Sequence, residues 1–437
     1  MQHSVAETYT LRAHNASVTS LSVTYDGTIP ILASGDSNGR IYAWNLITRR
    51  PFAKYELPSQ ASIEYLEYID GFLFALCKDS SLQILSLEAL DERFYAPTLL
   101  TGQRTRTMAE FSNVYEIPVN TLNFANVAIQ PLSKERYRLW CCNTMDSQLI
   151  DIYSFDIRDP RSLTREFRGL NLYPMVKRFK ETRTGMNFDR LGIVMKFAAC
   201  ENGVIYVGYE SGFVIGLEFE QTKNPVVGQK LFRLNVSYVS SAHCPDPVLS
   251  ICADPTTGNV LSSSTHNKIY VHSTLENHHY GSYTSTVSPE TNVSTEYGYC
   301  TSINFEAKVI ELPVKQISDI ESRGSILALN SWKGQSLIFE NLNPIANFCK
   351  KKCAVVGNEK SIGNADSEAE AKNFIKPNAL ACLWLNLMNY DLSNATFNRK
   401  RFLNILLNNW CFIAYEDGSI LMHKVTPLTN RSERKIP

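Results

Sequence analysis

The sequence has no excess of charge of either sign and no long apolar run. Lysine and arginine together number 43, as do aspartate and glutamate, so the chain of 437 residues has no net charge to attract nucleic acid or an acidic membrane. No segment approaches the roughly 18 apolar residues of a membrane-spanning helix, and the N-terminus lacks a charged start followed by an apolar stretch. We therefore expect an intracellular protein with no membrane partner and no direct contact with nucleic acid.

The sequence also lacks several motifs that mark common enzymes and metal sites. It contains no G-x-x-x-x-G-K-[ST], no G-x-G-x-x-G that opens a helix and no H-E-x-x-H. The eleven cysteines are odd in number and scattered, as expected of reduced thiols. Cys349 and Cys353 have the spacing of two zinc ligands, but no second pair lies nearby and lysines separate them. We expect no catalytic residue, no cofactor, no metal and no small-molecule ligand.

Trp44 is the most informative residue that the sequence does contain. It lies in the segment 32–46, which has the pattern of the end of a WD repeat and follows His14 and an apolar alternation at residues 18–23, in the order of a four-stranded blade. In such blades a histidine, a serine, an acid and the tryptophan form a hydrogen-bonded network that stabilises the sheet. The matching residues here are His14, Ser34, Asn38 and Trp44, with Asn38 in place of the usual acid.

Six further segments repeat the pattern of an apolar strand, a tight turn and a second apolar strand. Because one blade buries both faces of its sheet only between neighbours, these segments predict a single all-β domain over residues 1–437, a seven-bladed WD-repeat β-propeller with long loops between strands and blades. Residues 8–11 are expected to supply the outer strand of the last blade. The expected blades cover about 14–50, 61–100, 117–157, 190–235, 243–300, 308–342 and 379–425, with a mobile insertion at about 343–378.

Basic residues concentrate in a predicted insertion at residues 158–183. Four of them are our candidates for binding a partner: Arg165, Arg168, Lys177 and Arg178. The alternative is a solvated loop packed by its own aromatic residues. Residues 273–300, rich in serine and threonine, are expected to form an exposed loop.

The histidines provide a test for an enzyme built in the central channel. Such an enzyme requires ionisable groups that converge there, and the residues to examine are His243, His266, His272 and His423. The alternative is that these histidines pack between strands as structural groups.

Several segments, taken in order, resemble the fungal ASTRA-associated WD-repeat proteins. They are 34–51, 117–124, 206–212, 247–250 and 330–334, so the resemblance spans nearly the whole chain. It implies a non-catalytic, protein-binding subunit of the ASTRA assembly, linked to chromatin regulation. It also implies association with the cochaperone machinery that matures phosphatidylinositol-3-kinase-related kinases, and a location in the nucleus and also the cytoplasm. The alternatives of a different class are a substrate receptor of a ubiquitin ligase and a trafficking coat subunit.

Overall fold

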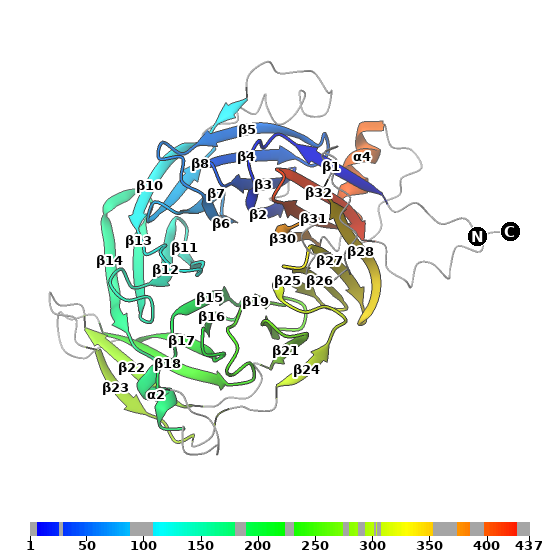
Figure 1. The fold of residues 1–437 in the computed structure, drawn as a ribbon. Helices are drawn as coiled ribbons and strands as arrows, with labels where there is room; N and C mark the ends of the chain where they lie inside the picture. The colour runs from blue at the N-terminus through cyan, green and yellow to red at the C-terminus, as the bar shows by residue number, and fades with distance from the viewer. Residues whose placement is uncertain are drawn as a thin grey trace, which may run out of the picture.

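The computed structural model shows a ring of seven β-sheets around a central channel (Figure 1). Each sheet contains four strands in the order of a propeller blade, and three sheets carry additional strands. The predicted all-β, seven-bladed propeller is confirmed for the residues that the structure describes, which are 7–25, 29–87, 108–179, 189–222, 231–273, 279–286, 293–300, 303, 307–352, 374–384 and 397–425. Within this part of the chain, no helix has the length and apolar character needed to cross a membrane.

In blades 1 to 3 the strands follow one another outwards from the channel (Figure 1). Blade 1 contains β2 (Val18–Tyr25), β3 (Pro30–Asp36), β4 (Arg40–Asn45) and β5 (Arg50–Glu56), with the short β9 (Ala109–Glu110) parallel to β5. Blade 2 contains β6 (Ile63–Ile69), β7 (Phe72–Cys77), β8 (Ser81–Ser86) and β10 (Ser112–Pro118). Blade 3 contains β11 (Ala128–Ser133), β12 (Arg136–Cys142), β13 (Ile150–Asp156) and β14 (Asp159–Leu170), and is followed by the helix α2 (Tyr173–Lys177).

Blades 4 and 5 depart from a plain four-strand succession. Blade 4 contains β15 (Val194–Ala199), β16 (Val204–Tyr209), β17 (Val214–Thr222) and β18 (Leu231–Ser240), and the hairpin of β22 (Gly281–Thr286) and β23 (Val293–Tyr297) extends its outer edge. Blade 5 contains β19 (Ser250–Ala253), β20 (Val260–Ser263), β21 (Lys268–His272) and β24 (Lys308–Glu311). The chain therefore visits blade 4 again before it completes blade 5.

Blades 6 and 7 complete the ring. Blade 6 contains β25 (Ile317–Arg323), β26 (Ile326–Ser331), β27 (Gln335–Glu340), β28 (Asn343–Lys351) and the short β29 (Phe374–Ile375). Blade 7 contains β30 (Pro377–Leu383), β31 (Asn409–Tyr415) and β32 (Ser419–Val425), with the helix α4 (Phe397–Leu406) ahead of β31. Its outer strand is β1 (Thr8–Arg12), which runs antiparallel to β32 from the pair Thr8 and His423 to the pair Arg12 and Ser419. The predicted closure by residues 8–11 is thus confirmed.

The core of the described protein consists of seven apolar clusters, each shared by two neighbouring blades. The cluster between blades 7 and 1, for example, contains the fully buried Trp44 and Trp410 together with Leu11 of the closing strand. Burial of one large apolar side chain contributes about 1.5–3 kcal/mol. Stability therefore depends on every blade having both of its neighbours.

Several predicted blade boundaries are wrong at the outer strands. Blade 2 was expected to end near residue 100, yet its outer strand is β10 at 112–118, which overlaps the predicted start of blade 3. Blade 5 was expected to reach residue 300, but residues 281–286 and 293–297 form the two paired strands that extend blade 4, so the predicted exposed loop at 273–300 is wrong in those parts. The physical reason is that pairing with the third strand, and not proximity in sequence, decides which segment becomes the outer strand.

The two predicted insertions are also partly wrong. The basic segment 158–183 begins with β14, the outer strand of blade 3, because residues 159–170 pair along β13. The segment 343–378 begins with β28, the outer strand of blade 6, and ends in β29 and the start of β30. Its middle, residues 353–373, lies outside the described residues.

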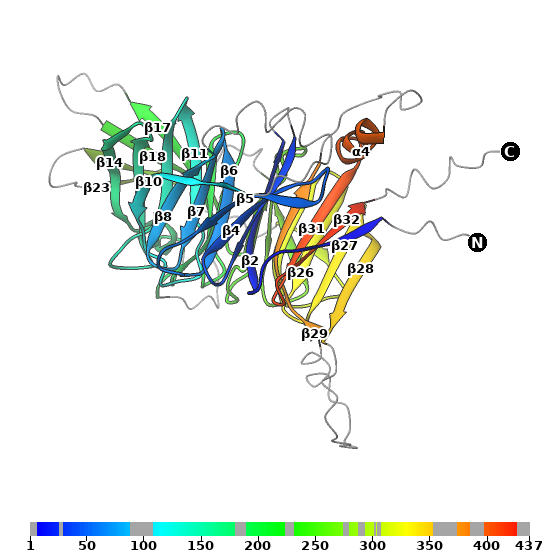
Figure 2. The ribbon, with the colours of Figure 1, turned by 90° about the horizontal axis from the view of Figure 1, so that it is seen from above.

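The two faces of the ring carry different connections. On one face, the turn between the second and third strands of a blade lies beside the connection that enters its first strand. In blade 1, Ser37 N donates to Ser17 O over 2.9 Å, and in blade 6, Trp332 N donates to Gln316 O over 3.1 Å. We call this the top face. It points downwards in Figure 2, where β29 marks it, whereas α4 lies on the opposite face.

Candidate functional site

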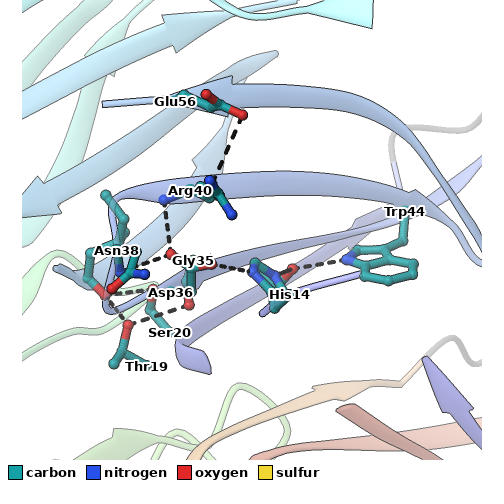
Figure 3. A network of polar contacts seen from close by, with 11 residues as sticks. His14, Thr19, Ser20, Gly35, Asp36, Asn38, Arg40, Trp44 and Glu56 are labelled. Atoms are coloured by element: carbon teal, nitrogen blue, oxygen red, sulfur yellow. Dashed lines mark hydrogen bonds and ion pairs between the residues drawn. The ribbon is translucent and has the colours of Figure 1, made fainter. Parts of the chain in front are cut away.

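The polar network of blade 1 joins β3, β4 and the connection that enters the blade at the top face (Figure 3). Trp44 Nε1 donates to Ser34 Oγ over 2.8 Å, and Ser34 Oγ lies 2.7 Å from His14 Nε2. His14 Nδ1 lies 2.8 Å from Asp36 Oδ2, and all four side chains are buried. The network is a continuous path of hydrogen bonds from the third strand of the blade to the turn before it, and its role is structural because it satisfies buried polar groups.

Asp36 supplies the acid of this network, so the assignment of that role to Asn38 is wrong. The backbone N–H groups of Asn38 and Arg40 both donate to Asp36 Oδ1 over 2.9 Å. Burial opposes ionisation of Asp36, but the hydrogen bonds from His14 and from these two N–H groups outweigh it and lower the pKa of the carboxyl. The ionised Asp36 accepts a charge-assisted hydrogen bond from His14 Nδ1–H, which leaves Nε2 to accept from the Ser34 hydroxyl.

Blade 5 contains a second network at the equivalent positions. His243 Nε2 lies 2.7 Å from Ser262 Oγ, which lies 2.6 Å from His272 Nε2. Tyr238 Oη extends the path at 2.8 Å from His272 Nδ1, and His266 Nε2 extends the other end at 3.1 Å from His243 Nδ1. His272 thus replaces the tryptophan of blade 1.

The direction of donation is reversed in blade 5 because no carboxylate ends the path. The backbone N–H of Lys268 donates to His266 Nδ1 over 3.1 Å, so His266 carries its proton on Nε2 and donates to His243. His243 then donates to Ser262, Ser262 to His272, and His272 to Tyr238. Burial lowers the pKa of His243 and His266, and that of His272 to about 3, so the path consists of neutral imidazoles.

Replacement of Ser34 by alanine is expected to destabilise the propeller more than loss of an ordinary buried hydroxyl. Ser34→Ala leaves both the Trp44 indole N–H and the His14 ring nitrogen buried without this partner, which costs about 2–4 kcal/mol in the free energy of unfolding. The matched control is Ser263→Ala, since the fully buried Ser263 donates to one carbonyl, Ile317 O at 3.0 Å, and its loss costs about 1 kcal/mol. Urea unfolding of the two variants measures the difference, and equal losses would contradict this account of the network.

The histidines do not converge in the channel. His243, His266 and His272 lie in blade 5, and His423 lies in blade 7, where Thr8 Oγ1 contacts its Nδ1 at 2.9 Å and burial lowers its pKa to about 4. None of the four lines the central cavity. Residues 35–39 match the G-x-S-x-G spacing of serine hydrolases, but they form a turn between two strands instead of the strand-to-helix turn that such a nucleophile requires. No group of three potential metal ligands occurs among the described residues.

The four basic candidates do not form one free surface. Arg178 donates to the carbonyl oxygens of Tyr280, Gly298 and Cys300 over 3.0, 3.0 and 2.6 Å, so it fastens α2 to the hairpin region outside blade 4. Arg165 is half-buried, with its guanidinium 4.9 Å from the centre of the Tyr153 ring. Only Arg168 and Lys177 are exposed.

A change at Arg178 is therefore expected to loosen the outer edge of blade 4. Arg178→Ala removes three hydrogen bonds from a charged donor to carbonyls, a loss of about 1.5–3 kcal/mol. Hydrogen exchange measures this locally: amides of β22 and β23 should exchange faster in Arg178→Ala and at the wild-type rate in the control Lys177→Ala. Unchanged exchange in Arg178→Ala would show that the hairpin does not depend on this clamp.

The central channel contains a group of acidic residues that sequence reasoning missed. Its cavity of about 960 Å³ is lined by the first strands of the blades and carries four carboxylates and one lysine among the described residues. We call Glu64, Glu67, Asp319 and Glu321 the channel carboxylates; the lysine is Lys196. The available signal was the alternation of charge along first strands, as in Asp319-Ile-Glu321, where every second side chain faces the channel.

The channel carboxylates differ in how their charge is satisfied. Asp319 accepts from the backbone N–H of Leu380 over 2.9 Å and from that of Ile320 over 3.1 Å. Glu67 accepts from the Tyr65 hydroxyl over 3.0 Å, whereas the side-chain carboxylate of Glu321 has no hydrogen bond or ion pair with any described residue. Burial in the channel raises the pKa of Asp319 to about 6, that of Glu67 to about 7 and that of Glu321 to about 8.

Exposed apolar side chains lie on the top face, and two of them reach the mouth of this channel. We call Leu122, Phe124, Met145 and Trp332 the mouth residues; their exposed fractions are 85%, 74%, 90% and 47%. Phe124 and Trp332 also line the cavity. The loops that carry the first three are tied together, because Asn120 Nδ2 donates to Asn143 O over 2.7 Å and to Ser147 Oγ over 3.0 Å.

Comparison with known proteins gives consistent matches over nearly the full length of the chain. Residues 7–423 match the family model of ASTRA-associated protein 1. ASTRA-associated protein 1 of Lachancea thermotolerans is 39% identical over 430 residues, which cover 97% of this chain and 99% of the relative. The protein of that name from Kluyveromyces lactis is 36% identical over 96% of this chain and 98% of its own, and that from Saccharomyces cerevisiae strain JAY291 is 29% identical over 95% and 96%.

Proposed function

This chain belongs to the ASTRA-associated protein 1 family, and from that premise we propose that it is a non-catalytic, protein-binding subunit of an ASTRA-linked assembly. The observation that carries the proposal is the match of the entire propeller, from residue 7 to residue 423, to proteins named for this association. The name of these relatives, ASTRA-associated protein 1, supports membership of a multiprotein complex. The propeller therefore has to provide the contacts with the other subunits.

The architecture supports a binding function over catalysis. A closed ring with seven interblade cores holds its loops in fixed positions, so little conformational entropy is lost when a partner docks. The blade networks, which contain three of the four histidines considered for catalysis, are explained by buried hydrogen bonding. Exposed apolar residues at the channel mouth are typical of a protein-binding surface.

The finer parts of the proposal concern partners and location. We place the protein in the nucleus and also the cytoplasm, with a role in chromatin regulation and contact with the cochaperone machinery that matures phosphatidylinositol-3-kinase-related kinases. Arg168 and Lys177, the exposed members of the predicted basic group, are proposed as secondary contacts to an acidic partner surface.

Affinity purification of the tagged full-length chain from its native host, at native expression level, tests this function. ASTRA subunits and kinase cochaperone proteins are expected to be enriched over a purification with an unrelated tagged seven-bladed propeller. Enrichment of cullin adaptors or vesicle-coat subunits in their place would overturn the proposal. Fluorescence microscopy of the same tagged chain tests the location.

A further inference from the structure

The central channel is a built cavity whose charge is not balanced from within. Of the five charged groups that line it among the described residues, four are acidic, and the one cation among them, Lys196, has a pKa lowered by burial. Lys196 interacts electrostatically with Asp319 and Glu64, whereas no cation among the described residues acts on Glu67 or Glu321. The Glu67 and Glu321 side chains are only partly open to water, and a cation brought from outside would stabilise their ionised form.

The mouth residues add an independent indication of a ligand. Two large side chains from distant blades, Phe124 ahead of blade 3 and Trp332 in blade 6, remain exposed while they line the same cavity. Exposed aromatic groups around a cavity are typical of a binding surface, because their apolar area is released from water only when a partner covers it. The site therefore combines an apolar rim with an acidic interior.

The chemistry of the occupant follows from this combination. The acidic interior repels nucleic acid, phosphate and acidic peptides, and attracts lysine or arginine. A cavity of about 960 Å³ admits a few side chains but no folded domain. A long basic side chain also fits the geometry, since its alkyl part can pass the apolar rim while its charge reaches the interior.

We propose that the top face binds an extended segment of a partner protein, which inserts a lysine or arginine side chain toward Glu67 and Glu321 and packs apolar side chains against Phe124 and Trp332. This inference rests on the proposed function as a protein-binding subunit and specifies its contact surface. Recognition is by one inserted cation and a short apolar flank, a mode that a rigid ring can provide without rearrangement.

Short peptides with one lysine flanked by leucine and phenylalanine, labelled with fluorescein, are the probes for this site. Fluorescence anisotropy with the full-length protein should show binding of the lysine peptide and at least tenfold weaker binding when norleucine or glutamate replaces lysine. The variants Glu67→Gln/Glu321→Gln and Trp332→Ala should each weaken binding at least tenfold. Leu342→Ala is the matched control, because Leu342 is 53% exposed in a turn on the opposite face, and it should bind as the wild type does. Equal binding of the norleucine peptide, or wild-type affinity of the double variant, would overturn the site.

Binding should also tighten as the pH rises from 6 to 8.5. The groups that face the interior are Glu64, Tyr65 and Glu67 from β6, Lys196 from β15, Cys252 from β19, Asp319 and Glu321 from β25 and Cys382 from β30. Within this range Glu67 and Glu321 lose their protons, given pKa values of about 7 and 8, and only the ionised form attracts the inserted cation. An affinity that does not change with pH would contradict the involvement of these two carboxylates.

Thermal unfolding of Glu321→Gln shows whether the variant folds. It also shows whether the charge of Glu321 lowers the stability of the folded protein. The pKa of Glu321 is raised in the folded state, so the folded state binds more protons than the unfolded chain between about pH 4.5 and 8, and wild-type stability falls as the pH rises through that window. Glutamine carries no such proton, so the unfolding midpoint of the variant should exceed that of the wild type at pH 8.5 and equal it at pH 4. A lower midpoint at pH 8.5 would mean that the charge of Glu321 stabilises the fold, which contradicts the uncompensated acidic interior.

Purification of complexes separates failure of this site from failure of the proposed function. If the wild type co-purifies with ASTRA subunits and Glu67→Gln/Glu321→Gln does so equally, the function stands and the channel site is wrong. If the wild type co-purifies with none of them, the proposed function is wrong whatever the peptides bind.

Discussion

Removal of residues 1–12 is expected to abolish the monomeric folded state. This deletion takes away β1, whose five residues pair with β32, and removes Leu11 from the apolar cluster between blades 7 and 1. The ring then has an unpaired edge at β32 and an incomplete interblade core beside Trp410. Because exposed edges pair with other chains, we expect aggregation during size-exclusion chromatography and loss of the cooperative thermal transition.

Two substitutions separate the contribution of packing from that of strand pairing. Leu11→Ala removes buried side-chain atoms and should cost about 2–5 kcal/mol in the free energy of unfolding. Thr10→Ala, at the neighbouring exposed position of the same strand, should change it by less than about 0.5 kcal/mol. A monomeric, cooperatively folding protein after deletion of residues 1–12 would show that closure does not depend on β1.

Replacement of Gly212 by alanine is expected to be among the most destabilising single changes on the top face. Gly212 lies in the turn between β16 and β17 with a φ of +86°, where alanine costs roughly 1–2 kcal/mol in conformation alone. A Cβ there would lie 2.5 Å from Cys244 N and 2.6 Å from His243 C, both in the connection that enters blade 5. Because these are backbone atoms, the blades must move apart, and the total loss should reach about 3–5 kcal/mol.

Gly71 is the matched control for this prediction. Its φ of +90° imposes nearly the same conformational cost, but no atom lies within 4 Å of an added Cβ. Gly71→Ala should therefore lower the free energy of unfolding by about 1–2 kcal/mol, as measured by urea denaturation. Equal losses in the two variants would show that the contact between blades 4 and 5 does not confine Gly212.

The same close approach recurs around the ring. A Cβ on Gly39 would lie 2.9 Å from Ala61 O at the start of blade 2, and one on Gly418 would lie 2.7 Å from His14 O at the start of blade 1. In each case a glycine of the second turn in one blade contacts the backbone that leads into the next blade. These glycines set how closely neighbouring blades approach at the top face.

The sequence predicted the fold through features that are local and repeated. Trp44, with Ser34 ten residues before it and His14 ahead of the blade, identified one blade, and the strand and turn pattern gave the number of blades. The closing strand was also predictable, since the last blade lacked an outer strand. Each of these inferences depends on short spacings or on a count.

The errors arose where pairing over a long distance decides the outcome. Asn38 and Asp36 lie two residues apart, and the sequence does not show which of the two side chains faces His14. The conformation of the backbone decides this, and it directs the carboxyl of Asp36 toward His14. Likewise, periodicity does not show which sheet the strands at 159–170, 281–286 and 293–297 join, because the position of an outer strand depends on its neighbour in space. The channel carboxylates belong to different blades and meet only once the ring is closed.

The pairing of β1 with β32 has a consequence for translation. Thr8 leaves the ribosome 415 residues ahead of its partner His423, so β1 remains unpaired while the chain between them is made. Throughout that interval the Leu11 side chain and the adjoining surface of blade 1 are not yet buried against blade 7. A nascent chain that stalls before residue 419 thus presents an apolar, edge-exposed surface, which makes it a target for ribosome-associated chaperones until the last strand arrives.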